Sequence, residues 1–197
     1  MQNGRDIAPT VNRLLSLPFV LRLATRDAHP ASHISFAANH PNAQPFTSTT
    51  TIVHPSDPSR TYETTLWPIH CVQGTSGAAL VPELEQGNLD AVIDKGRAEK
   101  LEMYSAFYDP FQIEDSGVKR RLKEAGATHV YVVGLAGDYC VKATAVDSAK
   151  EGFVTYLVEE GTRCVEPGKW GDVKKELEGN GVKIVSIDGE EVATVRR

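Results

Sequence analysis

The sequence contains few cysteines and no long apolar segment. Its three cysteines, Cys71, Cys140 and Cys164, are odd in number and far apart, which does not fit a disulfide framework and suits a reducing compartment. No apolar run is long enough to cross a bilayer, and Met1 to Pro9 lacks the apolar core of a secretory signal. We therefore expect an intracellular protein, with the cytoplasm as its compartment.

The sequence also lacks an excess of basic residues. Its formal net charge is −5, and no cluster of lysine and arginine is interleaved with aromatic residues, which argues against a general nucleic-acid-binding protein. Of its 197 residues, 41% are hydrophobic and 24% are charged, so a sizeable core can form without disulfides. This length favours a single domain over residues 1–197, with a loop insertion over about residues 27–74.

Apolar runs alternate with helical patterns along the second half of the chain. We expect strands at 91–94, 129–133, 153–158 and 183–187, and helices at 116–125, from 139 or 140 onward, and at 167–177. Upstream of these elements we expect a helix over 6–17 capped by Asp6, a strand over 19–24 and a β-like run over 46–53. Downstream of them, we expect the tail at 190–195 to be extended. The alternation predicts an α/β fold with a mostly parallel sheet and helices on both faces.

A reactive thiol is expected where the predicted strand 129–133 turns into a helix. Cys140 stands at the helix N-terminus, whose dipole stabilises a thiolate. Lys95 follows another strand and would lower the pKa of that thiol. Sites in parallel sheets lie beyond the carboxyl ends of the strands, so Asp27, Lys95 and Cys140 should meet at one edge. Taken alone, the cysteine could be a buried inert thiol and the lysine a solvated strand end.

A second cluster has the residue types of a metal site. Asp27 and His29 are two residues apart, and a carboxylate beside an imidazole suits a divalent transition metal. His70 is a candidate third ligand, and Ser35 could contribute directly or through water. The simpler interpretation is that Asp27 caps a turn and His29 is a surface histidine.

Two aromatic residues, Trp67 and Tyr104, accompany these polar groups. Either they belong to the core, or they form the wall of a site for a planar ring substrate.

The order of the motifs carries more information than any single motif. Five segments follow one another: Asp27-x-His29, Trp67-Pro-x-His70-Cys-Val-Gln-Gly74, Lys95, Tyr104-Ser-Ala-Phe107 and Gly134-Leu-Ala-x-Asp-Tyr-Cys140. Together they closely resemble the nicotinamidases of the isochorismatase-like cysteine hydrolase superfamily, from about Gly4 to Val165. The resemblance implies a three-layer α-β-α fold, and hydrolysis of nicotinamide to nicotinate and ammonia in NAD salvage. It also implies a small-molecule amide as substrate and allows a homo-oligomer.

The resemblance also implies a role for each site residue. Cys140 matches the nucleophile and Lys95 the lysine of the catalytic triad. The family's metal ligands are matched by Asp27, His29 and His70. The metal, usually zinc, holds the pyridine nitrogen. Ser35 matches a further polar position near the metal. In the family a cis peptide precedes the residue matched by Ala136, and the N–H groups of Ala136 and Cys140 would form the oxyanion hole. Within such a site, Trp67 and Tyr104 are the residues that we expect to bind the substrate.

The chain departs from the family pattern in three places. The family's first strand, which ends in the aspartate of the triad, has no counterpart in residues 1–9, so we expect a gap between strands 19–24 and 129–133. Ala28 stands where tryptophan is common, and Gly137 stands where threonine is common. Three explanations of the missing strand remain: an incomplete sequence, which we favour, another segment such as the C-terminal tail in its place, or a non-catalytic relative. The rival functions are a metal-free cysteine amidohydrolase of this fold, a non-catalytic relative that binds metal or ligand, and a subunit whose sheet is completed by a partner's strand.

Overall fold

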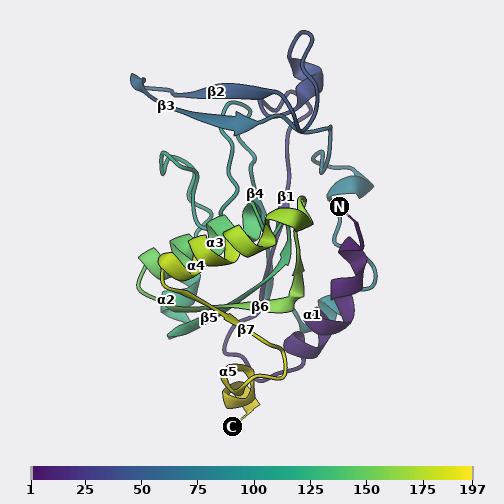
Figure 1. Ribbon diagram of the computed structural model, residues 1–197, viewed down its shortest axis with the longest axis vertical. Coiled ribbons are helices and arrows are strands. Elements are labelled where there is room, and N and C mark those ends of the chain that lie inside the picture. The colour runs from purple at the N-terminus through teal and green to yellow at the C-terminus, as the bar shows by residue number, and fades with distance from the viewer. Residues whose placement is uncertain (1, 197) are drawn as a thin grey trace.

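The computed structural model describes residues 2–196 and contains three separate sheets (Figure 1). The first pairs β1 (Leu23–Asp27) with β4 (Ala91–Lys95) in parallel. The second has the order β5 (His129–Leu135), β6 (Val154–Arg163) and β7 (Val182–Val185), also in parallel. The third is the antiparallel hairpin of β2 (Thr49–His54) and β3 (Asp57–Thr65). The hairpin projects from the rest of the molecule.

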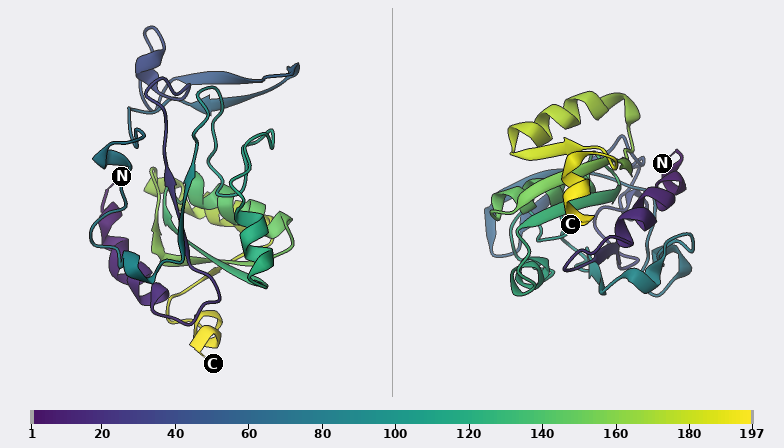
Figure 2. Two further views of the ribbon diagram at one scale, coloured as in Figure 1. Left: turned by 180° about the vertical axis from the view of Figure 1, so that it is seen from behind. Right: turned by 90° about the horizontal axis from the view of Figure 1, so that it is seen from below.

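Helices cover both faces of the larger sheet, as the alternating pattern predicted (Figure 2). The helices are α1 (Ala8–Leu15), α2 (Val118–Glu124), α3 (Cys140–Lys150), α4 (Trp170–Gly179) and α5 (Glu190–Ala193). On one face α3 and α4 contribute Val141, Ala145 and Leu177 to a buried cluster. On the other face, Leu14 of α1 and Val192 of α5 pack against β6 and β7. The fold is therefore the predicted α/β fold with mostly parallel sheets. Among the described residues, no helix combines the length and apolarity that a membrane span requires.

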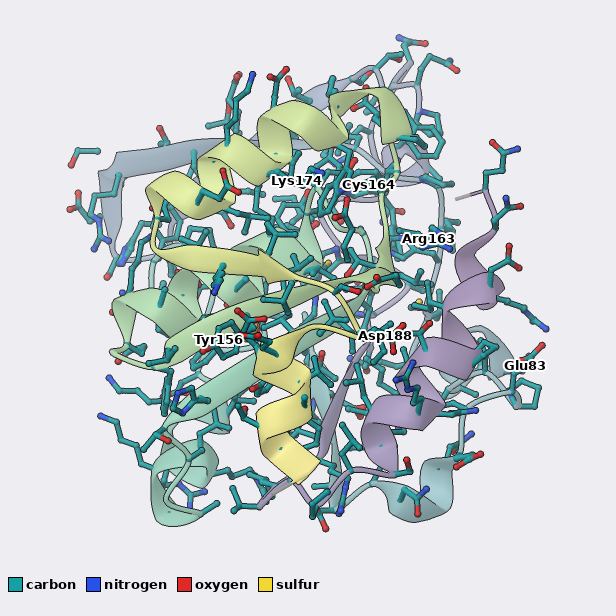
Figure 3. All side chains as sticks on the ribbon, turned by 60° about the horizontal axis from the view of Figure 1, so that its bottom comes forward. Glu83, Tyr156, Arg163, Cys164, Lys174 and Asp188 are labelled. Atoms are coloured by element: carbon teal, nitrogen blue, oxygen red, sulfur yellow. The ribbon has the colours of Figure 1, made fainter. Side chains whose placement is uncertain are left out.

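Two predictions at the termini are wrong. Asp6 does not cap the first helix, because it lies in a 3₁₀ turn over Gly4–Ile7, and the helix begins with no side-chain cap. The tail is helical over Glu190–Ala193, because two glutamates in its first turn favour a helix N-terminus and Val192 is fully buried. Asp188, labelled in Figure 3, pairs with Arg13 of α1 at 2.5 Å and ties this tail to the first helix.

Several strand boundaries differ from the prediction. β2 begins at Thr49 instead of residue 46, β6 continues to Arg163 instead of ending at 158, and β7 ends at Val185 instead of 187. β1 begins at Leu23, four residues later than expected, so Asp27 is the last residue of the strand. Strand β3 was not predicted, because most of its residues are polar and exposed and do not alternate with apolar ones.

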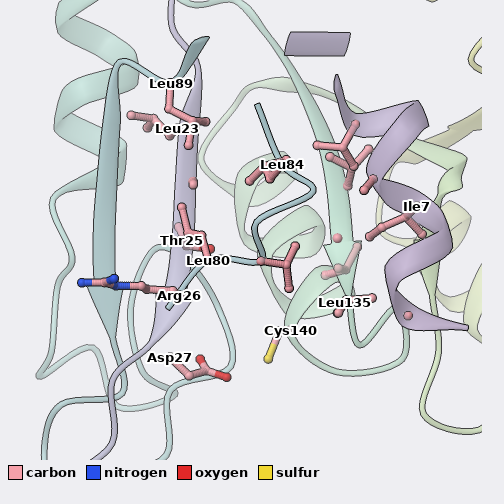
Figure 4. Close-up of a pocket in the computed structure, with 18 of the residues that line it drawn as sticks. Ile7, Leu23, Thr25, Arg26, Asp27, Leu80, Leu84, Leu89, Leu135 and Cys140 are labelled. Carbon is pink, nitrogen blue, oxygen red and sulfur yellow. The ribbon is translucent and has the colours of Figure 1, made fainter. Parts of the chain in front are cut away.

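The predicted gap lies between β1 and β5. In the described chain β1 pairs only with β4 and β5 only with β6, so the two parallel sheets are not joined by a strand. A cavity of about 380 Å³ occupies this space, between the two strands and beside α1 (Figure 4). We call it the slot. The missing pairing leaves one open edge on each strand.

Candidate active site

Cys140 and Lys95 meet at the carboxyl ends of their strands, as predicted. Cys140 is the first residue of α3, and Lys95 is the last residue of β4. The Lys95 ammonium lies 3.5 Å from the Cys140 sulfur and also donates a hydrogen bond to the Met103 carbonyl at 2.9 Å. Its closest anion is Asp27, at 2.6 Å, in an ion pair rather than a well-aligned hydrogen bond. A thiol, an ammonium and a carboxylate therefore form one contiguous group.

The acid–base properties of the thiol differ from the prediction. Burial raises the pKa of Cys140 to about 12, although the positive charge of Lys95 acts in the opposite direction. Burial would lower the pKa of Lys95, but the electrostatic effects of Cys140 and Asp27 are larger and raise that pKa. Lys95 therefore stays a charged ammonium. Desolvation of the sulfur therefore acts against the predicted thiolate, and the ammonium of Lys95 offsets only part of this effect.

The three predicted metal ligands converge. One ligand atom from each of Asp27, His29 and His70 lies within 4.8 Å of the other two. Burial would raise the pKa of Asp27, but the positive charge of Lys95 outweighs this effect and lowers the pKa, so the carboxylate is anionic. Burial lowers the pKa of His29, which keeps its imidazole neutral. One carboxylate and two imidazoles are a donor set that could hold a divalent metal ion.

Backbone carbonyls orient both imidazoles of this cluster. His29 Nδ1 lies 2.8 Å from the Gly96 carbonyl, and His70 Nδ1 lies 2.8 Å from the Pro68 carbonyl. A carbonyl only accepts hydrogen bonds, so each Nδ1 carries the proton and each Nε2 keeps its lone pair for a ligand. Metal-binding histidines in proteins are commonly fixed in this way.

The aromatic residues line a cavity of about 290 Å³ that contains Cys140, Lys95 and the three candidate ligands. The Trp67 indole N–H donates to the Tyr104 hydroxyl at 2.9 Å, and that oxygen lies 2.8 Å from Thr64 Oγ1. Trp67 packs edge-on against Tyr139, with ring centroids 4.7 Å apart. Tyr139 and Phe46 also line the cavity. Phe46 was expected to begin a β-like run, but it lies in the irregular segment before β2, and no motif marked it as a site residue.

The turn before Cys140 has two free amides but a different peptide geometry from that implied by the family. The Leu135–Ala136 bond is trans, and Ala136 adopts φ +45°. In the described chain neither the Ala136 N–H nor the Cys140 N–H donates a hydrogen bond. Both amides are therefore available to an acceptor on the substrate.

Ser35 lies outside the cavity. It is fully buried, and its hydroxyl is 2.8 Å from His33 Nδ1. Glu102, which sequence reasoning did not single out, does line the cavity. Burial raises the pKa of Glu102 to about 7. Only the three-dimensional arrangement could identify it, since a glutamate in a loop has no distinctive pattern.

The family departure at Gly137 has a packing explanation. A Cβ atom at this position would lie 2.8 Å from both the sulfur of Cys164 and the methyl group of Thr162. These neighbours leave room only for glycine.

Asp138 does not cap α3, because its carboxylate accepts hydrogen bonds from the Val165 and Glu166 amides instead.

Comparisons with known proteins identify the family of the chain. Residues 28–188 match the isochorismatase domain family. The chain is 37% identical to a nicotinamidase of Acinetobacter baylyi over 93% of this chain and 82% of that protein. The yeast nicotinamidase bound to the inhibitor nicotinaldehyde superposes with a TM-score of 0.89, at 33% identity over 94% of this chain and 90% of that one. The pyrazinamidase of Pyrococcus horikoshii in complex with zinc superposes with a TM-score of 0.71, at 31% identity over 94% and 88%.

Proposed function

This chain belongs to the isochorismatase family, and we propose that it is a nicotinamidase, which converts nicotinamide and water to nicotinate and ammonia. One observation carries the proposal: a thiol–ammonium pair and an Asp-His-His cluster line the same aromatic-walled cavity. A planar ring bound between the aromatic side chains would present its amide to the thiol. The fold, the nicotinamidase relatives and the donor set support this function together.

Cys140 is the proposed nucleophile. Its sulfur attacks the carboxamide carbon, and a C–S bond forms while the carbonyl oxygen gains negative charge. The N–H groups of Ala136 and Cys140 would donate hydrogen bonds to that oxygen. The C–N bond then breaks, and ammonia leaves with the proton that the thiol gave up. Water cleaves the thioester, which releases nicotinate and restores the thiol.

Zinc is the proposed ion at Asp27, His29 and His70. The donor set fits it, because the two histidines present Nε2 lone pairs and three protein ligands leave an open position. When bound, zinc supplies a Lewis acid that holds the ring nitrogen of the substrate. Ser35 does not line this cavity and its hydroxyl lies 2.8 Å from His33 Nδ1, so we do not include it among the proposed ligands.

Gly96 should control the affinity for this ion. Its φ is +63°, and a Cβ atom there would lie 2.6 Å from His29 Cε1. Gly96→Ala should therefore displace the imidazole and weaken zinc binding by roughly 10- to 100-fold, measured by competition with a chromogenic chelator. Gly126→Ala is the matched control, because Gly126 has φ +69° and no atom within 4 Å of the added carbon. Equal zinc affinity in the two variants would show that Gly96 does not position His29.

Tyr104 should set substrate affinity through Trp67. Tyr104→Phe removes the oxygen that accepts the indole N–H, and a buried donor left without a partner costs about 1–3 kcal/mol. We expect the KM for nicotinamide to rise by about 10-fold with a smaller change in kcat. Tyr131→Phe is the control, because that hydroxyl bonds to the Glu191 carbonyl, away from the cavity. An unchanged KM in the Tyr104 variant would show that Tyr104 does not contribute to substrate binding.

A second candidate function follows from what surrounds the thiol. In residues 2–196, no carboxylate accepts a hydrogen bond from Cys140, and Lys95 is its side-chain partner. A general base for thiol deprotonation would be expected there. The alternative is a non-catalytic relative that binds zinc and nicotinamide.

Ammonia release from nicotinamide distinguishes the two functions. The zinc-loaded protein is assayed as it stands, and again with an added N-terminal strand that ends in aspartate. Release in either form that is lost with Cys140→Ala supports the hydrolase. Binding of nicotinamide without release in both forms would support the second candidate and contradict the first.

A further inference from the structure

Phe46 is an exposed aromatic residue at the cavity that contains Cys140. Its side chain lines this cavity, and yet Phe46 is 59% exposed to solvent. His29 and Lys95 line the same cavity and are only 2% and 5% exposed. The buried residues therefore form the inner end of the cavity, and Phe46 stands at its outer end, where solvent enters.

The backbone holds Phe46 in a conformation that a bulky residue rarely adopts. Its φ is +69°, in the left-handed region. The Phe46 N–H donates to the Leu66 carbonyl at 2.7 Å, and the Leu66 N–H donates to the Ser48 carbonyl at 2.8 Å. The turn is closed by the Gln44 N–H, which donates to the Ser48 hydroxyl at 2.9 Å. Strained conformations that the surrounding structure fixes in this way cluster at ligand-binding positions.

The ring of Phe46 continues the aromatic wall of the cavity outward. The ring centroids of Phe46 and Trp67 lie 5.7 Å apart, with the planes at 87°. Trp67 also packs against Tyr104 and Tyr139, at 6.4 and 4.7 Å. Phe46 is the most exposed of these four residues. An apolar ligand that covered its ring would remove apolar surface from water, which favours binding.

The proposed function fixes which edge of the substrate ring faces outward. The amide on ring carbon C3 of nicotinamide must reach Cys140, and the ring nitrogen must reach an ion at Asp27, His29 and His70. The nitrogen, C2 and C3 lie on one edge of the ring, so this edge faces the buried residues. The opposite edge, with C5 at its centre, then faces the outer end of the cavity and Phe46.

We propose that Phe46 determines the ring specificity of this site: it closes the outer end of the cavity against C5 and excludes carboxamides that carry a large group there. The inference rests on the proposed function, because the orientation of the ring follows from it. The hydrogen-bonded turn fixes the backbone of Phe46, and Trp67 behind it is buried. The phenyl ring therefore cannot move aside without breaking these contacts.

The experiment compares two isomers of equal size and apolarity, 5-phenylnicotinamide and 2-phenylnicotinamide. Their affinities are measured by calorimetry on the zinc-loaded Cys140→Ala protein, in which no thioester can form. Adding Phe46→Ala should raise the affinity for the 5-phenyl isomer, relative to nicotinamide, by at least ~10-fold. The relative affinity for the 2-phenyl isomer should stay unchanged, because its phenyl group meets the buried end of the cavity.

Two further variants complete the test. Phe111→Ala is the matched control, because Phe111 packs against His54 and Tyr62 and does not line the cavity. It should change neither relative affinity. Phe46→Trp makes the opposite change and should weaken 5-methylnicotinamide, relative to nicotinamide, by at least ~10-fold. This variant also decides the question if Phe46→Ala proves unfolded by circular dichroism.

Three results would overturn the proposal. They are an equal gain for both phenyl isomers in Phe46→Ala, the same gain in Phe111→Ala, and unchanged relative affinities in both Phe46 variants. Nicotinamide itself separates this inference from the proposed function. If it binds but the protein with Cys140 intact releases no ammonia, the hydrolase assignment fails and the C5 comparison still decides the role of Phe46. If nicotinamide does not bind at all, both are wrong.

Discussion

Cys140→Ala should reduce nicotinamide hydrolysis by at least ~10⁴-fold, because it removes the atom that forms the covalent intermediate. The sulfur lies in the cavity beside Lys95, and no other described cysteine contacts that ammonium. Ammonia release under single-turnover and steady-state conditions measures the loss. Zinc content should be unchanged, since Cys140 is not among the three candidate ligands.

Cys164→Ala provides the matched control. It also removes a thiol, but Cys164 packs against Gly137 and does not line the cavity. We expect activity within a few-fold of the wild-type protein, with a lower thermal midpoint because a buried side chain is shortened. Substantial activity in the Cys140 variant would show that another residue attacks the amide.

Lys95→Met should lower the rate by about 10³-fold. Lys95 holds the thiol, the Met103 carbonyl and Asp27 together. Its ammonium also opposes the effect of burial on the pKa of Cys140, so its loss should move that pKa further upward. The rate of Cys140 alkylation by iodoacetamide as a function of pH reports this shift separately from turnover.

Lys100→Met is the control for Lys95, because it makes the same chemical change at an exposed position. It should leave both the rate and the alkylation profile unchanged. Lys95→Met could lower the rate and leave the alkylation profile unchanged. In that case Lys95 only holds the site together, and the prediction that its ammonium lowers the pKa of Cys140 is wrong.

The sequence was sufficient for the α/β fold and for the grouping of the site residues. Lys95 and Cys140 each lie at a strand–loop junction, and the carboxyl ends of parallel strands meet at one edge. That rule needs only the approximate position of each strand, so the late start of β1 did not matter. The gap beside β1 followed from an absent segment in the family pattern, and the structure confirms it.

Properties that depend on burial could not be predicted from the sequence. The raised pKa of Cys140 follows from how deeply its sulfur is desolvated, which no local pattern encodes. Gly96 belongs to no motif. It matters because a Cβ atom at this position would lie only 2.6 Å from His29 Cε1. Phe46 reaches the cavity from an irregular segment. The helical tail was missed because the burial of Val192 outweighs the weak local signal.

Asp27 belongs both to the group formed with Lys95 and Cys140 and to the cluster formed with His29 and His70. One of its oxygens is paired with Lys95 at 2.6 Å, and the other lies 3.9 Å from His29 Nε2. A metal ion held at Asp27, His29 and His70 would therefore alter the electric field at the Lys95 ammonium, and through it the thiol of Cys140. If the proposed metal binds there, a substitution that changes metal preference would also change the reactivity of the nucleophile, because Asp27 contacts both groups.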